Sequence, residues 1–133
     1  MDPKLIIEEM KVQPSINAET EVRRRVDFIK TTLVNSGLKS LVLGISGGID
    51  SSTCGRLAQL AVNELNGEHG GYQFIAVRLP YDVQADEADA QLALNFIQPC
   101  HVLTTNIKNG AEGIHQETLS AMDQAGILTA SDA

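Results

Sequence analysis

Apolar and polar positions in this chain follow two spacings, one typical of helices and one typical of buried strands. The first long helical pattern begins after Asn17, a good N-cap residue, and ends at Gly37. Its apolar residues fall on one side of a helix, so we expect them to be buried together. They are Val22, Val26, Ile29 and Leu33. A shorter helix is expected before it, from Pro3 to about Val12, with Asp2 as its cap.

Three short apolar runs predict strands, and each is followed by a helical pattern. The strands are Leu41–Ile45, Tyr72–Leu79 and His101–Ile107. The helices are Ser51–Asn66, Ala85–Ile97 and Lys108–Gln124. We expect Gly67 to stop the first of these helices, and we expect the second to bury Leu92, Ala93, Phe96 and Ile97. The acids Asp86, Glu87 and Asp89 are expected to complement the dipole at the start of that second helix.

Alternation of strands and helices predicts the α/β class, with a parallel sheet, helices on both faces and right-handed crossovers. Residues 1–133 have the length of a single domain. In parallel sheets of this kind ligands bind at the carboxyl ends of the strands. The loops after Ile45 and Leu79 should therefore share one edge, and the loop after Ile107 is a third candidate for it.

The central strand leads into a glycine- and serine-rich loop, Ser46-Gly47-Gly48-Ile49-Asp50-Ser51, and then into a helix. Glycines allow an anion to approach the backbone closely, and the helix start adds the positive end of its dipole. Asp50 would repel a bare phosphate, so a hard cation such as Mg²⁺ is expected between the two. No lysine lies between Leu41 and Leu65, which excludes a Walker loop, and the glycine spacing excludes a dinucleotide fingerprint.

The charge composition bears on which kinds of molecule this protein can bind. Lys and Arg number 10 and Asp and Glu number 17, giving a net charge of −7. Such an acidic chain, without a basic stripe, argues against a nucleic-acid partner. No apolar run approaches membrane-spanning length, and the first residues do not have the pattern expected of a signal peptide. Two cysteines far apart, Cys54 and Cys100, fit a reducing compartment, so we expect a cytoplasmic protein.

The S-G-G-x-D-S loop after a strand resembles the pyrophosphate loop of the ATP pyrophosphatase superfamily, which cleaves ATP between the α and β phosphates. Within that superfamily, two further stretches resemble ammonia-dependent NAD synthetases. They are Ile16–Lys30 and Phe74–Gln98. One position departs from the family pattern, since Asp82 stands where glycine is expected. Aspartate tolerates left-handed backbone better than most residues.

This resemblance implies an enzyme that joins ammonia to deamido-NAD, using ATP and Mg²⁺ and releasing AMP and pyrophosphate. Asp50 would coordinate the metal, and no catalytic residue is assigned. The ATP-binding residues that the resemblance implies are Gly44, Ile45, Ser46, Gly47, Gly48, Ile49, Asp50, Ser51, Arg78 and Gln84. The family is also homodimeric and roughly twice as long as this chain, so the resemblance covers its N-terminal part.

Ammonia is the expected nitrogen donor, because the 39 residues before the central strand are too few for a glutaminase domain. Two alternatives remain open. One is another pyrophosphate-loop amidating ligase, similar to GMP synthetase. The other is an ATP-binding fragment without catalysis.

Overall fold

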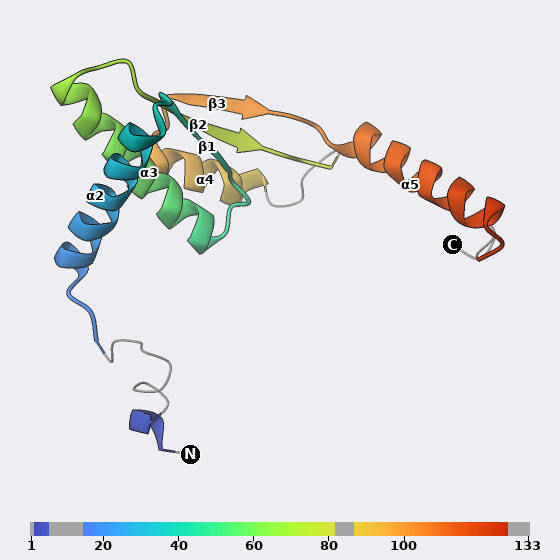
Figure 1. The fold of residues 1–133 in the computed structure, drawn as a ribbon, viewed down its shortest axis with the longest axis horizontal. Coiled ribbons are helices and arrows are strands. Elements are labelled where there is room, and N and C mark those ends of the chain that lie inside the picture. Colours follow the sequence, from blue (N-terminus) through green and yellow to red (C-terminus); the bar gives the residue numbers. More distant parts are fainter. Residues whose placement is uncertain (1, 6–14, 82–86, 128–133) are drawn as a thin grey trace.

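The computed structural model describes residues 2–5, 15–81 and 87–127. Within these residues helices and strands alternate, and the three strands form one sheet (Figure 1). The elements are α2 (Ala18–Ser36), β1 (Ser40–Gly44), α3 (Ile49–Glu68), β2 (Gln73–Arg78), α4 (Glu87–Ile97), β3 (His101–Thr104) and α5 (Lys108–Gln124). The predicted helix from Pro3 to Val12 falls largely outside the described residues, of which 3–5 form a helical turn.

Helix α2 begins and ends where its sequence predicts. The Asn17 side chain accepts a hydrogen bond from the Thr20 N–H at 3.0 Å, and Gly37 closes the helix in a left-handed conformation with φ 75°. Val26 and Leu33 of the predicted stripe are buried. Val22, in the N-terminal part of α2, is 43% exposed.

The sheet is parallel, in the order β1-β2-β3. Leu43 pairs with Ala76, and Ala76 pairs with Val102, so side chains of this row point to the same face. In β2 the alternation is clear: Phe74 and Ala76 are fully buried, whereas Ile75 is only partly buried. One face of the sheet therefore carries the core.

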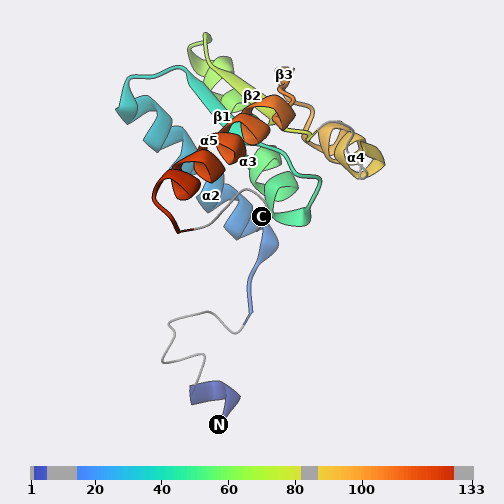
Figure 2. The ribbon, with the colours of Figure 1, turned by 90° about the vertical axis from the view of Figure 1, so that its right-hand side faces the viewer.

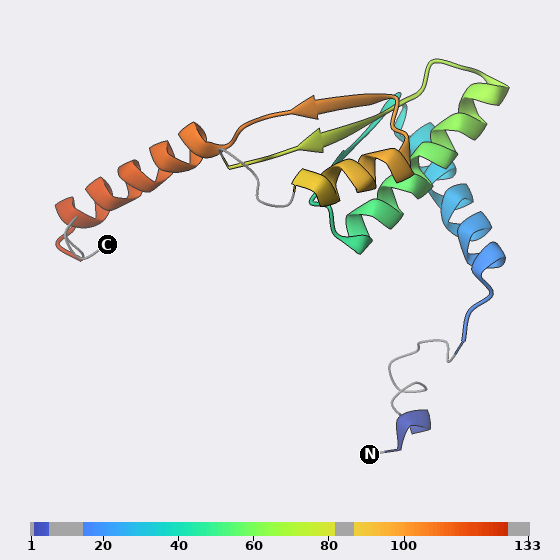
Figure 3. The ribbon, with the colours of Figure 1, turned by 180° about the vertical axis from the view of Figure 1, so that it is seen from behind.

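Helices α3 and α4 both cover that face. The core joins Val62 and Leu65 of α3 to Ile97 of α4 and to Phe74 of β2, and α2 packs on α3 (Figures 1 and 3). Each new strand joins the sheet at the same edge, so β2 lies next to β1 and β3 lies next to β2. With right-handed crossovers, this order places both connecting helices on the same face.

The parallel sheet predicted from the sequence is confirmed and is Rossmann-like, but the described part of the chain does not place helices on both faces, because the second face is open. On that face Val42 is 64% exposed and Leu103 is 52% exposed. A helix reaches the second face only when the strand order reverses, and three strands in the order β1-β2-β3 contain no reversal. Helix α5 does not cover it, because α5 extends away from the sheet (Figure 1). In the view of Figure 2, turned by 90°, α5 points toward the viewer and lies in front of the sheet.

Two local predictions were wrong. Helix α3 continues through Gly67 to Glu68, and the chain turns at Gly70 and Gly71, which have positive φ. The Asn66 side chain holds this turn through hydrogen bonds to the N–H and C=O of Tyr72, at 2.8 and 2.9 Å.

In α4, Leu92 and Phe96 were expected inside but are 68% and 58% exposed. The buried side of α4 is formed by Ala90, Ala93 and Ile97. Small alanines let the helix approach α3 closely. Leu92 and Phe96 share the other side of the helix, where nothing among the described residues covers them.

Candidate nucleotide site at the carboxyl edge of the sheet

The loops that follow the three strands meet at one edge, as predicted. The backbone N–H groups of Thr105 and Ile107, beyond β3, donate to the carbonyls of Arg78, the last residue of β2, and of Pro80, at 2.8 and 2.9 Å. A hollow of about 210 Å³ lies at this edge. It is lined by Gly44, Ile45, Ser46, Val77 and Leu79. Three of the predicted ATP-binding residues therefore line one small cavity.

The loop between β1 and α3 is held by its own serines. Ser51 Oγ accepts from the Ser46 N–H at 3.3 Å and lies 3.2 Å from Ser46 Oγ. Ser46 Oγ in turn accepts from the Gly48 N–H at 3.2 Å. These bonds close the loop back on the first turn of α3, so residues 46–51 form one compact unit.

Gly47 has φ +92°, a conformation that favours glycine. A Cβ atom at this position would lie 3.3 Å from the backbone nitrogen of Ala90 in α4. The loop is therefore packed against the first turn of α4 as well as against its own helix. Only glycine fits here without strain.

The start of α3 favours an anion. Its N-cap is Gly48, and no described side chain caps the first turn by a hydrogen bond. The N–H groups of a helix start and the positive end of its dipole attract phosphate, and here they follow a glycine loop that leaves the backbone accessible. Ile49, the first residue of α3, is 82% exposed, so the start of the helix is accessible from solvent.

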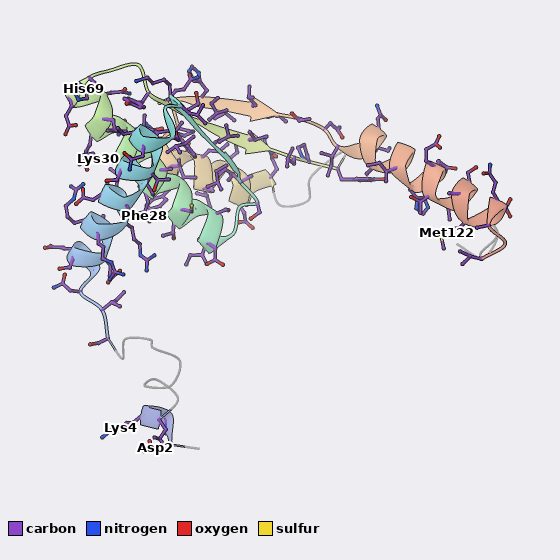
Figure 4. The ribbon with its side chains drawn as sticks, viewed as in Figure 1. Asp2, Lys4, Phe28, Lys30, His69 and Met122 are labelled. Carbon is purple, nitrogen blue, oxygen red and sulfur yellow. The ribbon has the colours of Figure 1, made fainter. Side chains whose placement is uncertain are left out.

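Asp50 lies in the first turn of α3 and is exposed. Asp50 does not line the hollow at the edge of the sheet. It lines a second hollow, of about 380 Å³, between α2 and α3. That hollow is also lined by Arg25, Phe28, Ile29, Thr53, Cys54 and Leu57. Figure 4 shows Phe28 and Lys30 on α2, beside α3.

The described residues contain no group of three His, Cys, Asp or Glu side chains that could hold a metal ion. Mg²⁺ does not require one, since it is usually bound through one or two carboxylates together with phosphates and water. An exposed carboxylate next to a glycine loop at a helix start fits this donor set. Asp50 is the residue that offers it.

Arg78 ends β2 and is one of the few polar residues in the interior, at 9% exposed. Its guanidinium forms an ion pair with Glu87 of α4. Hydrogen bonds from the Gln91 amide and then from Arg78 lower the pKa of Glu87. Gln84, the other predicted residue from this region, lies outside the described residues.

Two features of the site were missed from the sequence. One is the packing of Gly47 on α4, and the other is the role of Glu87 as the partner of Arg78. Glu87 was interpreted only as a first-turn acid. The pair could have been inferred from two features of the sequence. Arg78 ends a buried strand, and the loop after it leads into a helix that begins with acidic residues.

None of the helices in the described residues is both long and apolar enough to cross a membrane.

Comparison with known proteins gives a consistent picture. The profile of the NAD synthase family matches residues 21–130. The NH(3)-dependent NAD(+) synthetase of Aliivibrio salmonicida is 60% identical over 132 residues, which are 97% of this chain and 48% of that protein. The enzyme of the same name from Shewanella oneidensis is 60% identical over 126 residues, covering 93% and 46%.

A solved structure agrees with this. The crystal structure of NAD+ synthetase from Burkholderia pseudomallei matches with a TM-score of 0.79 at 43% identity, covering 95% of this chain and 52% of that one. The chain thus spans about half the length of the relatives that it matches. The profile match extends over the glycine loop, both hollows and the Arg78–Glu87 pair, and it places the chain in the NAD synthase family.

Proposed function

We propose that the protein to which this chain belongs is an ammonia-dependent NAD synthetase, a ligase that forms a C–N bond in NAD biosynthesis. The observation that carries the proposal is the 60% identity, over nearly the whole chain, to relatives named NH(3)-dependent NAD(+) synthetase. The substrates would be ATP, deamido-NAD and ammonia. The chain itself supplies the part that binds ATP.

The reaction requires a carboxylate to become an electrophile. An oxygen of the deamido-NAD carboxylate attacks the α-phosphorus of ATP, the bond to the β-phosphate breaks, and pyrophosphate leaves. Ammonia then adds to the acyl carbon, AMP leaves, and one proton is lost. Most of the charge develops on the departing pyrophosphate, so donors fixed in advance around it stabilise the transition state.

The loop between β1 and α3 is suited to that task. The start of α3 presents the positive end of its dipole beside the loop, and the Ser46–Ser51 contacts fix the loop geometry before any ligand arrives. Gly44–Ser51 would bind the phosphates. Arg78 would add a positive charge at the same edge, and Gln84 would contribute from the next loop.

Asp50 would hold Mg²⁺, which on binding would neutralise phosphate charge. Its carboxylate is exposed and belongs to the same helical turn as Ser51. Because it is exposed, a change of its rotamer would not disturb the fold.

The full-length protein would be a cytoplasmic homodimer. Two observations support this. Cys54 and Cys100 are both free, in keeping with a reducing compartment. Helix α5, which carries Met122, stands away from the sheet (Figure 4). A hollow of about 800 Å³, lined by Ile114 and Met122 among others, lies along α5, and a second subunit could cover it.

The test is pyrophosphate release by the chain in the presence of ATP, Mg²⁺, ammonium and deamido-NAD. Release that depends on deamido-NAD and is lost in Asp50→Asn would support the proposal. Glu19→Gln is the matched control, because it removes an acid from the first turn of α2. Release driven equally well by the substrate of a GMP synthetase would instead indicate a different amidating ligase.

A second candidate is an ATP-binding fragment without catalysis. It is favoured by the coverage, since about half of each relative has no counterpart in this chain. It predicts that the chain binds Mg-ATP but releases neither AMP nor pyrophosphate. Calorimetric titration with Mg-ATP alongside the release assay separates the two.

A further inference from the structure

The carboxylate of Glu87 is fixed at both of its oxygens. Oε2 accepts a hydrogen bond from Nη2 of Arg78, and Oε1 accepts one from Nε2 of Gln91 at 3.1 Å. Gln91 lies one turn further along α4, so the helix itself orients the carboxylate. Only 11% of the Arg78 side chain is exposed, against 52% of that of Glu87. Glu87 therefore contacts the buried Arg78 guanidinium from the side that faces solvent.

Arg78 is directly beside the glycine loop. Gly44 pairs with Val77, and the Ile45 N–H donates to the Val77 carbonyl at 2.9 Å, so Ile45 and Arg78 come next in register. Side chains that follow each other in register on parallel strands point to the same face. For these two it is the face covered by α3 and α4, toward which the loop also turns.

The first turn of α4 contacts the loop a second time. The Ala90 nitrogen and the Asp89 Cβ would lie 3.3 and 3.4 Å from a Cβ at Gly47. Thus the same helical turn that holds the guanidinium through Glu87 also packs against the loop. The turn fixes both parts of the edge relative to each other.

We propose that Glu87 is a positioning residue, which holds the Arg78 guanidinium ready for the phosphates of a nucleotide bound at the glycine loop. The inference rests on the proposed function. A long arginine side chain loses conformational freedom when it binds an anion, and a partner that fixes it beforehand removes that cost. Glu87 itself would then act only through Arg78.

Charge alone predicts the opposite effect. Glu87 is an anion near a phosphate site, so removing its charge should strengthen the binding of ATP if long-range attraction decided the matter. Positioning predicts weaker binding. The sign of the change in Kd therefore separates the two explanations.

The experiment measures the Kd for Mg-ATP by calorimetry in the 133-residue chain and in Glu87→Gln, with Asp89→Asn as the matched control from the same turn. Asn keeps the Asp89 Cβ that faces Gly47. We expect Glu87→Gln to raise the Kd roughly fivefold, as for one partly exposed ion pair, and Asp89→Asn to leave it unchanged or lower it slightly. Urea unfolding of each variant reports whether the fold is intact.

The same substitution in an Arg78→Ala background gives the decisive readout, which a merely structural role would not produce. If Glu87 acts through Arg78, Glu87→Gln has no further effect there. Unchanged or tighter binding by Glu87→Gln, or an equal loss in the Arg78→Ala background, overturns the inference and leaves the proposed function standing. Absence of Mg-ATP binding by the unsubstituted chain overturns the inference, and with it the proposal that this chain supplies the part that binds ATP.

Discussion

Gly55 of α3 lies directly against Ile97 of α4. A Cβ atom at residue 55 would be 2.7 Å from Cδ1 and 3.2 Å from Cγ1 of Ile97, and 3.4 Å from Cδ1 of Ile45. Ile97 is fully buried and cannot move aside into solvent. The close approach of the two helices thus depends on the missing side chain.

Gly55→Ala should therefore destabilise the fold. Overpacking of about 1–3 kcal/mol opposes a gain of up to about 1 kcal/mol from helix propensity, so a net loss of about 1–2 kcal/mol is expected in urea unfolding. Gly67→Ala is the matched control in the same helix, since nothing lies within 4 Å of its added Cβ. It should stabilise the protein by about 0.5–1 kcal/mol. Equal effects of the two substitutions would contradict this reasoning.

Gly47→Ala tests the glycine loop. Its φ of +92° and the Ala90 nitrogen at 3.3 Å both oppose a side chain. We expect a loss of about 1–2 kcal/mol in the free energy of unfolding, together with weaker binding of Mg-ATP. Gly44→Ala is the control for stability, because its Cβ would meet nothing within 4 Å, and it should change the free energy by less than about 0.5 kcal/mol. A Gly47→Ala chain with unchanged stability and affinity would refute the strained-loop interpretation.

The ion-pair network between α2 and α3 predicts a pH dependence. Glu64 accepts from Arg23 Nη2 at 2.7 Å and from Lys30 Nζ at 3.3 Å, and the hydrogen bond from Arg23 lowers its pKa below the ordinary value of 4.5. A lowered pKa in the folded state contributes stability that is fully present above pH 4.5 and is lost as the pH falls through the lowered value.

Glu64→Gln should therefore be less stable than the parent chain at pH 7 and nearly equal to it in strong acid. The difference should shrink in high salt, since the pair is partly exposed. Urea midpoints measured from pH 7 to pH 2 check this, with Glu112→Gln on α5 as a control that leaves the network intact. Parallel profiles for Glu64→Gln and the parent would contradict the prediction.

Gln59 anchors the start of β3 to α3. It is 3% exposed, its Oε1 accepts from the Cys100 N–H at 3.0 Å, and its Nε2 donates to Asn63 Oδ1 at 2.8 Å. Gln59→Leu removes the partner of a backbone N–H and should cost about 1–3 kcal/mol in urea unfolding. Gln116→Leu, on exposed α5, should stay within about 0.5 kcal/mol. A loss no larger than that of the control would show that Cys100 finds another acceptor.

Much of the site follows from local sequence. The strand Leu41–Ile45, the glycines and the serines of the loop lie next to one another in the chain, so their geometry depends on short-range hydrogen bonds and on backbone freedom. The same holds for the ends of α2, where Asn17 and Gly37 act on their own turns. Such features could be predicted because their causes are local.

Other features depend on contacts between distant segments. The buried side of α4 is set by how closely Ala90 and Ala93 let it approach α3, and the apolar periodicity that suggested Leu92 and Phe96 could not show this. The partner of Arg78 is nine residues away, across a loop and on another element. The sequence placed Glu87 at a helix start but not beside a buried cation.

By itself, therefore, the sequence determined the element order, the parallel α/β class, the position of the glycine loop after the first strand and the family resemblance. The tertiary structure decided that α3 and α4 share one face, that Asp50 faces a different hollow from Gly44 and Ser46, and that α4 joins the loop to Arg78. The reason is physical. Periodicity and glycine chemistry act within a few residues, whereas strand order and helix packing depend on which surfaces meet after the chain has folded.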